Sequence, residues 1–163
     1  MNYSKKIHDD YYTRKSSWEI IKDKIPKDKI IWEACLLNTN EQSKIYLKEL
    51  GFDVVGDNTI DIFKHDIGDV IVTNIPFSLK LKKMVLQRIV DLQKPFILLM
   101  NSTHIHTKYF HNIMGHLDLK YIIPSKKLHY DKYNKTTKIE SKNNTCFYSI
   151  FVTFNILDKN YFV

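Results

Sequence analysis

The residues best suited to chemistry form the segment Asn74-Ile75-Pro76-Phe77, which directly follows an apolar run at 70–72. A side-chain amide oxygen and a nearby backbone carbonyl can accept both hydrogens of an exocyclic amine, which leaves its nitrogen pyramidal with the lone pair available. A proline holds such a turn rigid, and a phenylalanine ring can stack on a base taken out of its helix. The segment therefore indicates chemistry on a nucleobase amino group, with an ordinary turn and a buried ring as the alternative interpretation.

The elements that position this segment alternate between short β-rich runs and helical stretches. We expect strands at 29–33, 53–56, 69–73 and 96–100, later strands at 121–123 and 146–156, and helices at 16–25, 41–50, 78–92 and 109–117. Such alternation is typical of βαβ units and of a parallel sheet covered on both faces. Because ligands bind beyond the carboxyl ends of such strands, we expect functional residues in the loops 33–40, 57–63, 74–78 and 101–106.

Length and composition favour one ordinary domain over residues 1–163. The chain has a mass of 19.4 kDa, with 44% hydrophobic and 26% charged residues, which suits a globular core. Its first twenty residues are polar and contain three carboxylates, which argues against a signal or transit peptide, and no apolar run is long enough to span a membrane. Cys35 and Cys146 are far apart and lack a metal-binding spacing, so we expect a cytoplasmic, intracellular protein.

The positive charge is concentrated in one segment. The net charge is +7, and residues 120–142 hold seven lysines against two carboxylates, which gives five of those charges. Cations neutralise phosphates and rings stack on unpaired bases, so we interpret about 120–145 as a basic insertion that contacts nucleic acid. A solvated lysine-rich loop is the alternative. The candidate contact residues are Lys126, Lys127, Tyr130, Lys132 and Tyr133.

A metal site is not indicated by the histidines. His104, His106, His111 and His116 lie close together in the chain, but no cysteine and no clear carboxylate accompanies them in ligand spacing. We therefore interpret them as structural and predict no bound metal.

The elbow segment 74–77 resembles the signature of the amino-methyltransferases that use S-adenosylmethionine, which reads Asp/Asn/Ser-Pro-Pro-Tyr/Phe/Trp. A closer resemblance is to small phage and giant-virus adenine methyltransferases, whose plan begins Phe-Tyr-Thr-Pro and continues through Trp-Glu-Pro to Asn-Pro-Pro-Phe. This chain has Tyr11-Tyr12-Thr13-Arg14, then Ile31-Trp32-Glu33, then the elbow, in that order. The segment 123–130 also resembles that family, so the resemblance extends over roughly residues 9–154.

This resemblance implies an α/β fold of the Rossmann-like methyltransferase class. The sheet is expected to be mostly parallel, with helices on both faces and an antiparallel last strand near 146–154. In the implied site Asn74 and the Ile75 carbonyl accept the adenine amine, Pro76 keeps them aimed, and Phe77 stacks on the base.

The resemblance also implies a set of cofactor contacts. Glu33 matches the acid near the methionine part of S-adenosylmethionine, and Thr13 matches a residue that contacts its carboxylate. Asp57 stands where a carboxylate would bind ribose hydroxyls. The segment Asp61-Ile62-Phe63 resembles the element that receives the adenine of the cofactor, with Asp61 accepting from its amino group and Ile62 or Phe63 against its ring. Turn formation is the alternative role for both aspartates.

The glycine-rich turn of the family is replaced here. Asn38 and Asn40 stand where its two glycines would be, with Thr39 between them. Asparagine tolerates positive φ better than other non-glycine residues, but its side chain occupies space that the cofactor needs. Either the cofactor pocket survives in altered form, or the fold is kept without the cofactor.

The function that these features predict is methyl transfer from S-adenosylmethionine to adenine N6 in DNA or RNA, on a single-stranded or flipped adenine. The alternative is a catalytically inactive methyltransferase-fold protein that binds nucleic acid or supports a partner. A third interpretation is an interaction protein unrelated to nucleic acid. All three interpretations are compatible with a protein partner or a homo-oligomer. If the chain is viral, as the resemblance suggests, we expect it to act in the host cell.

Overall fold

The computed structural model describes residues 11–36, 41–132 and 146–163. Within them, one sheet has seven strands in the order β3-β2-β4-β5-β8-β6-β9, and a separate antiparallel ribbon pairs β1 with β7. The strands of the large sheet are β2 (Ile31–Trp32), β3 (Val54–Val55), β4 (Val70–Asn74), β5 (Phe96–Asn101), β6 (Leu119–Ile123), β8 (Ser149–Phe154) and β9 (Tyr161–Phe162). The ribbon consists of β1 (Tyr11–Thr13) and β7 (Tyr130–Lys132).

Strand direction in the large sheet confirms the predicted fold class. Strands β3, β2, β4 and β5 run parallel, whereas β8 lies between β5 and β6 and is antiparallel to both. The sheet is therefore mostly parallel and Rossmann-like, and the expected antiparallel strand lies within 146–156. One detail of the prediction is wrong, because β8 is not the last strand.

A turn after β8 brings the chain back along the outer strand β6. Asn155 has φ 53° in this turn, and β9 then pairs parallel with β6. The Val163 N–H donates to the Ile123 carbonyl over 3.1 Å. An unpaired strand edge invites pairing with other chains, and the terminal residues cover part of this one.

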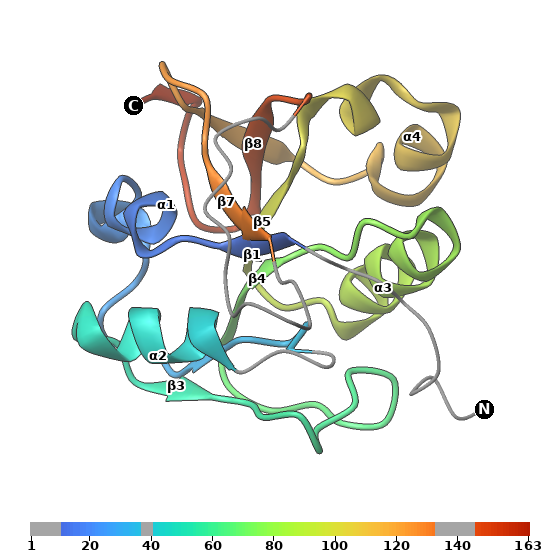
Figure 1. The fold of residues 1–163 in the computed structure, drawn as a ribbon. Coiled ribbons are helices and arrows are strands. Elements are labelled where there is room, and N and C mark those ends of the chain that lie inside the picture. The colour runs from blue at the N-terminus through green and yellow to red at the C-terminus, as the bar shows by residue number, and fades with distance from the viewer. Residues whose placement is uncertain (1–10, 37–40, 133–145) are drawn as a thin grey trace.

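Helices cover both faces of the sheet, as predicted (Figure 1). On one face lie α1 (Lys15–Glu19), the 3-10 helix η1 (Lys22–Lys24) and α2 (Gln42–Glu49), and on the other lie α3 (Leu79–Leu92), the 3-10 helix η2 (Ser102–His106) and α4 (Lys108–Met114). No helix of the described residues is long and apolar enough to cross a bilayer.

Alternating burial along the central strands explains why both faces must be covered. Ile71 of β4 belongs to the core on the α3 side, whereas Val70 and Val72 belong to the core on the α1 side. Side chains of a strand point alternately to the two faces, so an apolar run of this kind is stable only between two helical layers. The helix predicted for 78–92 is α3, and it places Leu81 and Ile89 in the core on its side of the sheet.

The largest boundary error concerns the first predicted helix. The stretch expected to be helical over 16–25 is α1 followed by a turn and then η1, ending at Ile25. Trp18 and Ile21 are fully buried against the sheet while Ile20 is exposed. The short segment is therefore held by its packing onto the sheet more than by helix propensity.

Gly56 sets how closely the loop after β3 approaches the end of β2. Its φ is +110°, and a Cβ at this position would lie 2.5 Å from the backbone oxygen of Glu33. No real Cβ makes such a contact with backbone, so a glycine is required for this approach.

We predict that Gly56→Ala lowers the free energy of unfolding by more than about 2 kcal/mol, because it adds a backbone clash to the cost of positive φ. Gly51→Ala is the matched control, since Gly51 has φ +94° with nothing within 4 Å of the added Cβ; its cost should be about 1 kcal/mol. Urea unfolding followed by circular dichroism compares the two variants, and equal losses would contradict the close approach at Gly56.

Candidate functional site

The predicted elbow lies where β4 ends. The Ile75 N–H donates to the Leu99 carbonyl over 2.9 Å, which is the last ladder bond between this segment and β5. Asn74 is half-buried, and its Oδ1 is buried with no hydrogen-bond partner among the described residues. A buried carbonyl oxygen without a donor is costly, so this position favours a ligand that brings an N–H or O–H group.

Four aromatic rings meet at this elbow, and we call them the elbow rings. They are Tyr11 of β1, Phe77, Tyr130 of β7, and Phe147, which precedes β8. The ring centroid of Phe77 is 5.3 Å from those of Tyr11 and Phe147 and 6.2 Å from that of Tyr130. The chain's own rings therefore contact Phe77, which remains half-buried.

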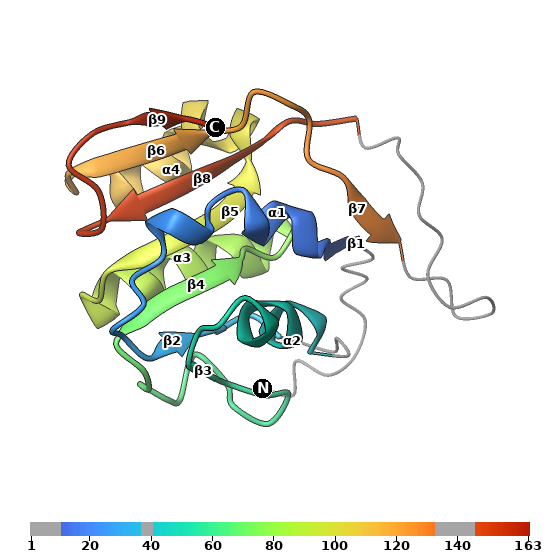
Figure 2. The same cartoon turned by 90° about the vertical axis from the view of Figure 1, so that its left-hand side faces the viewer.

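The β1–β7 ribbon supplies two of these rings. Figure 2 shows the ribbon beyond the carboxyl ends of β4 and β5, which is the edge where ligands were expected. The Arg14 Nε donates to Asp131 Oδ1 over 2.7 Å, which adds an ion pair next to the backbone pairing of the two strands. Arg14 replaces the proline of the family pattern, and in this chain its side chain ties the N-terminal segment to β7.

The structure corrects the role predicted for Tyr130. Only 1% of this residue is exposed, and its hydroxyl hydrogen-bonds to Ser149 Oγ over 2.7 Å. Burial raises the pKa of the Tyr130 hydroxyl to about 12. Pairing with β1 turns this ring toward Phe77, so it cannot stack on a base in solvent. Lysine spacing alone does not show which tyrosine of a basic segment faces inward.

The other residues predicted to contact nucleic acid are only partly described. Lys126 is exposed, and the Lys127 ammonium lies 5.5 Å from the centroid of the Tyr148 ring. Lys132 contributes its backbone to β7. Tyr133 lies outside the described residues, as do Asn38 and Asn40 of the predicted cofactor turn.

Glu33, at the end of β2, is a buried carboxyl group beside β4. It is 3% exposed, its Oε1 accepts a hydrogen bond from the Thr73 hydroxyl, and the Cys35 N–H approaches both Glu33 Oε1 (3.2 Å) and Thr73 Oγ1 (3.1 Å). Burial raises the pKa of the Glu33 carboxyl to about 7, although the hydrogen bonds from Thr73 and Cys35 lower it. This carboxyl group therefore exchanges a proton near neutral pH, and a nearby cation would favour its ionised form.

Thr13 places a second unpartnered polar group at this edge. The residue is 3% exposed, and its Oγ1 has no hydrogen-bond partner among the described residues. Its backbone position opposite Tyr130 in the ribbon fixes the side chain in place. A buried hydroxyl in this state can serve a ligand as donor or acceptor.

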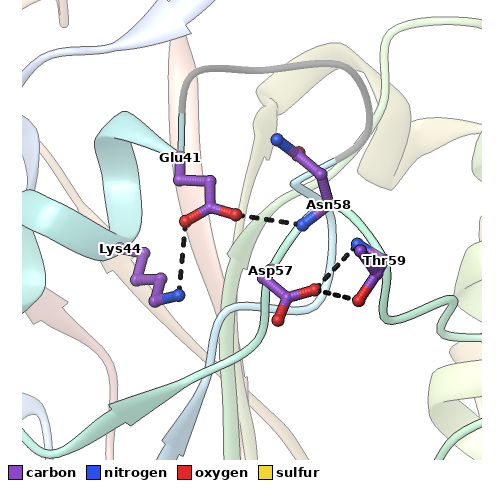
Figure 3. Close-up of polar contacts among 5 residues, drawn as sticks. All are labelled: Glu41, Lys44, Asp57, Asn58 and Thr59. Carbon is purple, nitrogen blue, oxygen red and sulfur yellow. Dashed lines mark hydrogen bonds and ion pairs between the residues drawn. The ribbon is translucent and has the colours of Figure 1, made fainter.

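Two carboxylates from separate segments, Glu41 before α2 and Asp57 after β3, both bond to the loop 57–59 (Figure 3). Asp57 Oδ1 accepts from the N–H of Thr59 (2.7 Å) and from its hydroxyl (2.5 Å), and these bonds lower the pKa of Asp57. Glu41 Oε1 accepts from the Asn58 N–H over 3.1 Å, while its Oε2 pairs with Lys44 at 3.3 Å. Sequence analysis missed Glu41, and its φ of 58° just before α2 is a feature that only the structure reveals.

Asp61 and Ile62 take different positions. Asp61 Oδ1 accepts from the Phe63 N–H over 2.9 Å, as expected for a turn-forming aspartate. Ile62 is 1% exposed and packs in the α3-side core. Of the two apolar residues Ile62 and Phe63, only Phe63 is partly accessible, because its side chain is half-buried.

A buried lysine near the elbow was not anticipated. The Lys82 ammonium, in the first turns of α3, lies 2.7 Å from His104 Nε2, and His104 Nδ1 lies 2.8 Å from the Tyr109 hydroxyl. Burial, followed by the charge of Lys82, lowers the pKa of His104. Among the described residues, no group of three or more histidine, cysteine, aspartate or glutamate side chains gathers as a metal site.

No protein-family model matches the chain, and no curated protein sequence does. Among solved structures, it is similar to precorrin-6y C5,15-methyltransferase from Geobacter metallireducens GS-15, with a TM-score of 0.47 and 12% sequence identity. The similarity covers 90% of this chain and 96% of that one. At this level the likeness concerns the fold alone.

We predict that Glu33→Gln removes a pH dependence of stability. The wild-type carboxyl has a pKa of about 7 in the folded protein, above its ordinary value of 4.5, so its protonation stabilises the fold below pH 4.5 and this contribution is lost as pH rises through 7. Glutamine stays neutral, so the free energy of unfolding of the variant should exceed that of the wild type by up to roughly 3 kcal/mol at pH 8.

Urea unfolding between pH 5 and pH 8 measures this difference. Glu49→Gln is the matched control, because Glu49 is exposed and pairs with Lys15 at the surface. If the free energies of unfolding of Glu33→Gln and the wild type changed with pH in the same way, the raised pKa of Glu33 would be refuted.

Proposed function

We propose that this protein transfers a methyl group from S-adenosylmethionine to the N6 amine of adenine in DNA or RNA. The observation that carries the proposal is the buried, unpartnered Oδ1 of Asn74 at the end of β4. It is an acceptor held in a rigid elbow, and the adenine amine is a donor with two hydrogens to give. The Ile75 carbonyl is the proposed second acceptor.

The described polar groups at this edge suit the parts of S-adenosylmethionine. Glu33 offers an oxygen to its ammonium group, Thr13 offers a hydroxyl to its carboxylate, and Asp57 offers a carboxylate oxygen to its ribose. Asp61 and Phe63 are the proposed contacts for its adenine. When bound, the cofactor supplies an electrophilic methyl group on a sulfonium sulfur.

The residues of the elbow prepare the adenine amine for attack. Hydrogen bonds to Asn74 Oδ1 and the Ile75 carbonyl weaken the conjugation of N6 with its ring, so the nitrogen lone pair becomes available. With the cofactor bound, N6 would take the methyl carbon as the bond from that carbon to sulfur breaks, and the sulfur would leave as a neutral thioether. The proton that N6 loses passes to water, so the step needs no general base from the protein.

Burial of Glu33 has a consequence for cofactor binding. The ammonium group of S-adenosylmethionine favours an ionised Glu33, whose pKa is about 7 in the absence of a ligand. Binding at pH 6 should therefore release a proton, and affinity should rise as pH increases through 7.

A second candidate function is a methyltransferase fold that binds nucleic acid or supports a partner without catalysis. Two observations favour it: Asn38 and Asn40 stand in place of the family glycines, and the elbow rings already contact Phe77. Isothermal titration calorimetry with S-adenosylmethionine separates the two functions. Heat of binding supports the enzyme, whereas no binding at millimolar cofactor would eliminate it.

We predict that Asn74→Ala lowers methyl transfer at least about 100-fold, because it removes an acceptor aimed at the reacting amine. Cofactor affinity should stay unchanged. Asn101→Ala is the matched control, since Asn101 ends the neighbouring strand β5 but its Oδ1 already accepts from the Thr103 N–H at 2.9 Å. Transfer of labelled methyl groups to adenine-containing oligonucleotides measures both variants, and wild-type turnover in Asn74→Ala would disprove the role of Asn74.

We predict that Thr13→Val weakens binding of S-adenosylmethionine about tenfold or more, because it removes a hydrogen bond to a charged group. The unliganded protein should keep its stability, since the hydroxyl has no partner to lose among the described residues. Calorimetry measures the affinity and a thermal melt measures the stability. A stability loss with unchanged affinity would mean that Thr13 has a structural role only.

A further inference from the structure

Tyr148 is an exposed aromatic residue one position away from the elbow rings. It is 66% exposed, whereas its neighbours Phe147 and Ser149 are half-buried and buried. Among the described residues, Tyr148 and Phe162 are the aromatic residues whose side chains are exposed, while the other rings are buried or half-buried. An exposed tyrosine at the edge where the site lies is therefore free to contact a partner.

The backbone around Tyr148 is fixed relative to the elbow. The Tyr148 carbonyl accepts from the Ser102 N–H over 2.9 Å, just after β5 ends. The preceding ring, Phe147, lies 5.3 Å from Phe77 between centroids. The backbone of Tyr148 is thus tied to the end of β5, and the residue that precedes it contributes one of the elbow rings.

A cation accompanies this ring. The Lys127 ammonium lies 5.5 Å from the Tyr148 centroid, and Lys126 beside it is exposed. The ring keeps most of its surface in solvent despite this contact. Proteins that bind single-stranded nucleic acid combine such rings, on which bases stack, with cations that neutralise phosphates.

We propose that Tyr148 stacks on the nucleotide next to the target adenine in a single-stranded nucleic acid, and that Lys127 contacts its phosphate. This inference rests on the proposed function, because it assumes that the target adenine binds at the elbow segment 74–77. A paired base has no free face for a ring, so the surface selects unpaired strands. Tyr148 therefore takes the stacking role first assigned to Tyr130, whose ring is buried.

The test is fluorescence anisotropy with a labelled oligonucleotide of about 12 nucleotides, as single-stranded DNA, as RNA and as a duplex, without any methyl donor. Tyr148→Ala should weaken single-strand binding about tenfold or more, while Tyr148→Trp should preserve it. Phe162→Ala is the matched control, because Phe162 is 78% exposed on β9 and is separated from β8 by β6. Its affinity should equal that of the wild type.

The salt dependence of binding tests the lysine. Lys127→Gln should reduce the slope of log affinity against log salt by about 0.7, the value for one phosphate contact on a single strand. Lys29→Gln is the control, because Lys29 precedes β2 at the opposite edge of the sheet and should leave the slope unchanged.

Three results would overturn the inference: wild-type affinity in Tyr148→Ala, an equal loss in Phe162→Ala, or duplex binding that matches single-strand binding. Because the assay contains no methyl donor, its outcome is independent of catalysis. A wild-type protein that never methylates but binds through Tyr148 contradicts the proposed function alone. A protein that methylates although Tyr148→Ala binds normally contradicts the inference alone.

Discussion

The end of β4 at a proline is the constraint on which the rest of the site depends. Pairing of this segment with β5 stops with the bond from Ile75 to Leu99, and Pro76, directly after that bond, fixes φ in the turn that follows. Both faces of the preceding strand are buried, which leaves it no freedom to shift. The side chain of Asn74 is therefore held at a fixed place on the sheet edge, with its oxygen buried and without a donor.

Around that elbow the protein keeps polar groups that its own structure does not fully use. The Thr13 hydroxyl has no partner among the described residues, and the Glu33 carboxyl favours its proton until about pH 7. Unsatisfied polar groups lower stability, and native proteins retain few of them. Of the seven buried side-chain atoms without a hydrogen-bond partner among the described residues, Asn74 Oδ1 ends β4 and Thr13 Oγ1 lies on the ribbon beyond it, and a bound ligand could supply a partner to each.

The sequence pattern predicted those strands and helices that depend only on residues close together in the chain. The apolar run at 70–72 predicted β4, and the alternation of β-rich and helical stretches predicted the helix at 78–92 that is α3. The elbow rings could not be predicted, because they come from four separate segments that only the folded chain brings together. Burial of Lys82 was equally hidden, since a lysine is expected in solvent unless tertiary contacts hold it.

The ribbon of β1 and β7 joins two segments that are far apart in the sequence. Arg14 and Asp131, which join its strands, are separated by 117 positions in the sequence. Closing so long a loop is entropically costly, and contacts of this range form slowly. During synthesis the residues of β2 to β5 are made before Tyr130 and Phe147, so Phe77 spends that interval without two of the rings that later contact it. The newborn chain thus exposes an aromatic surface that the finished protein conceals, and this interval is when a chaperone would recognise it.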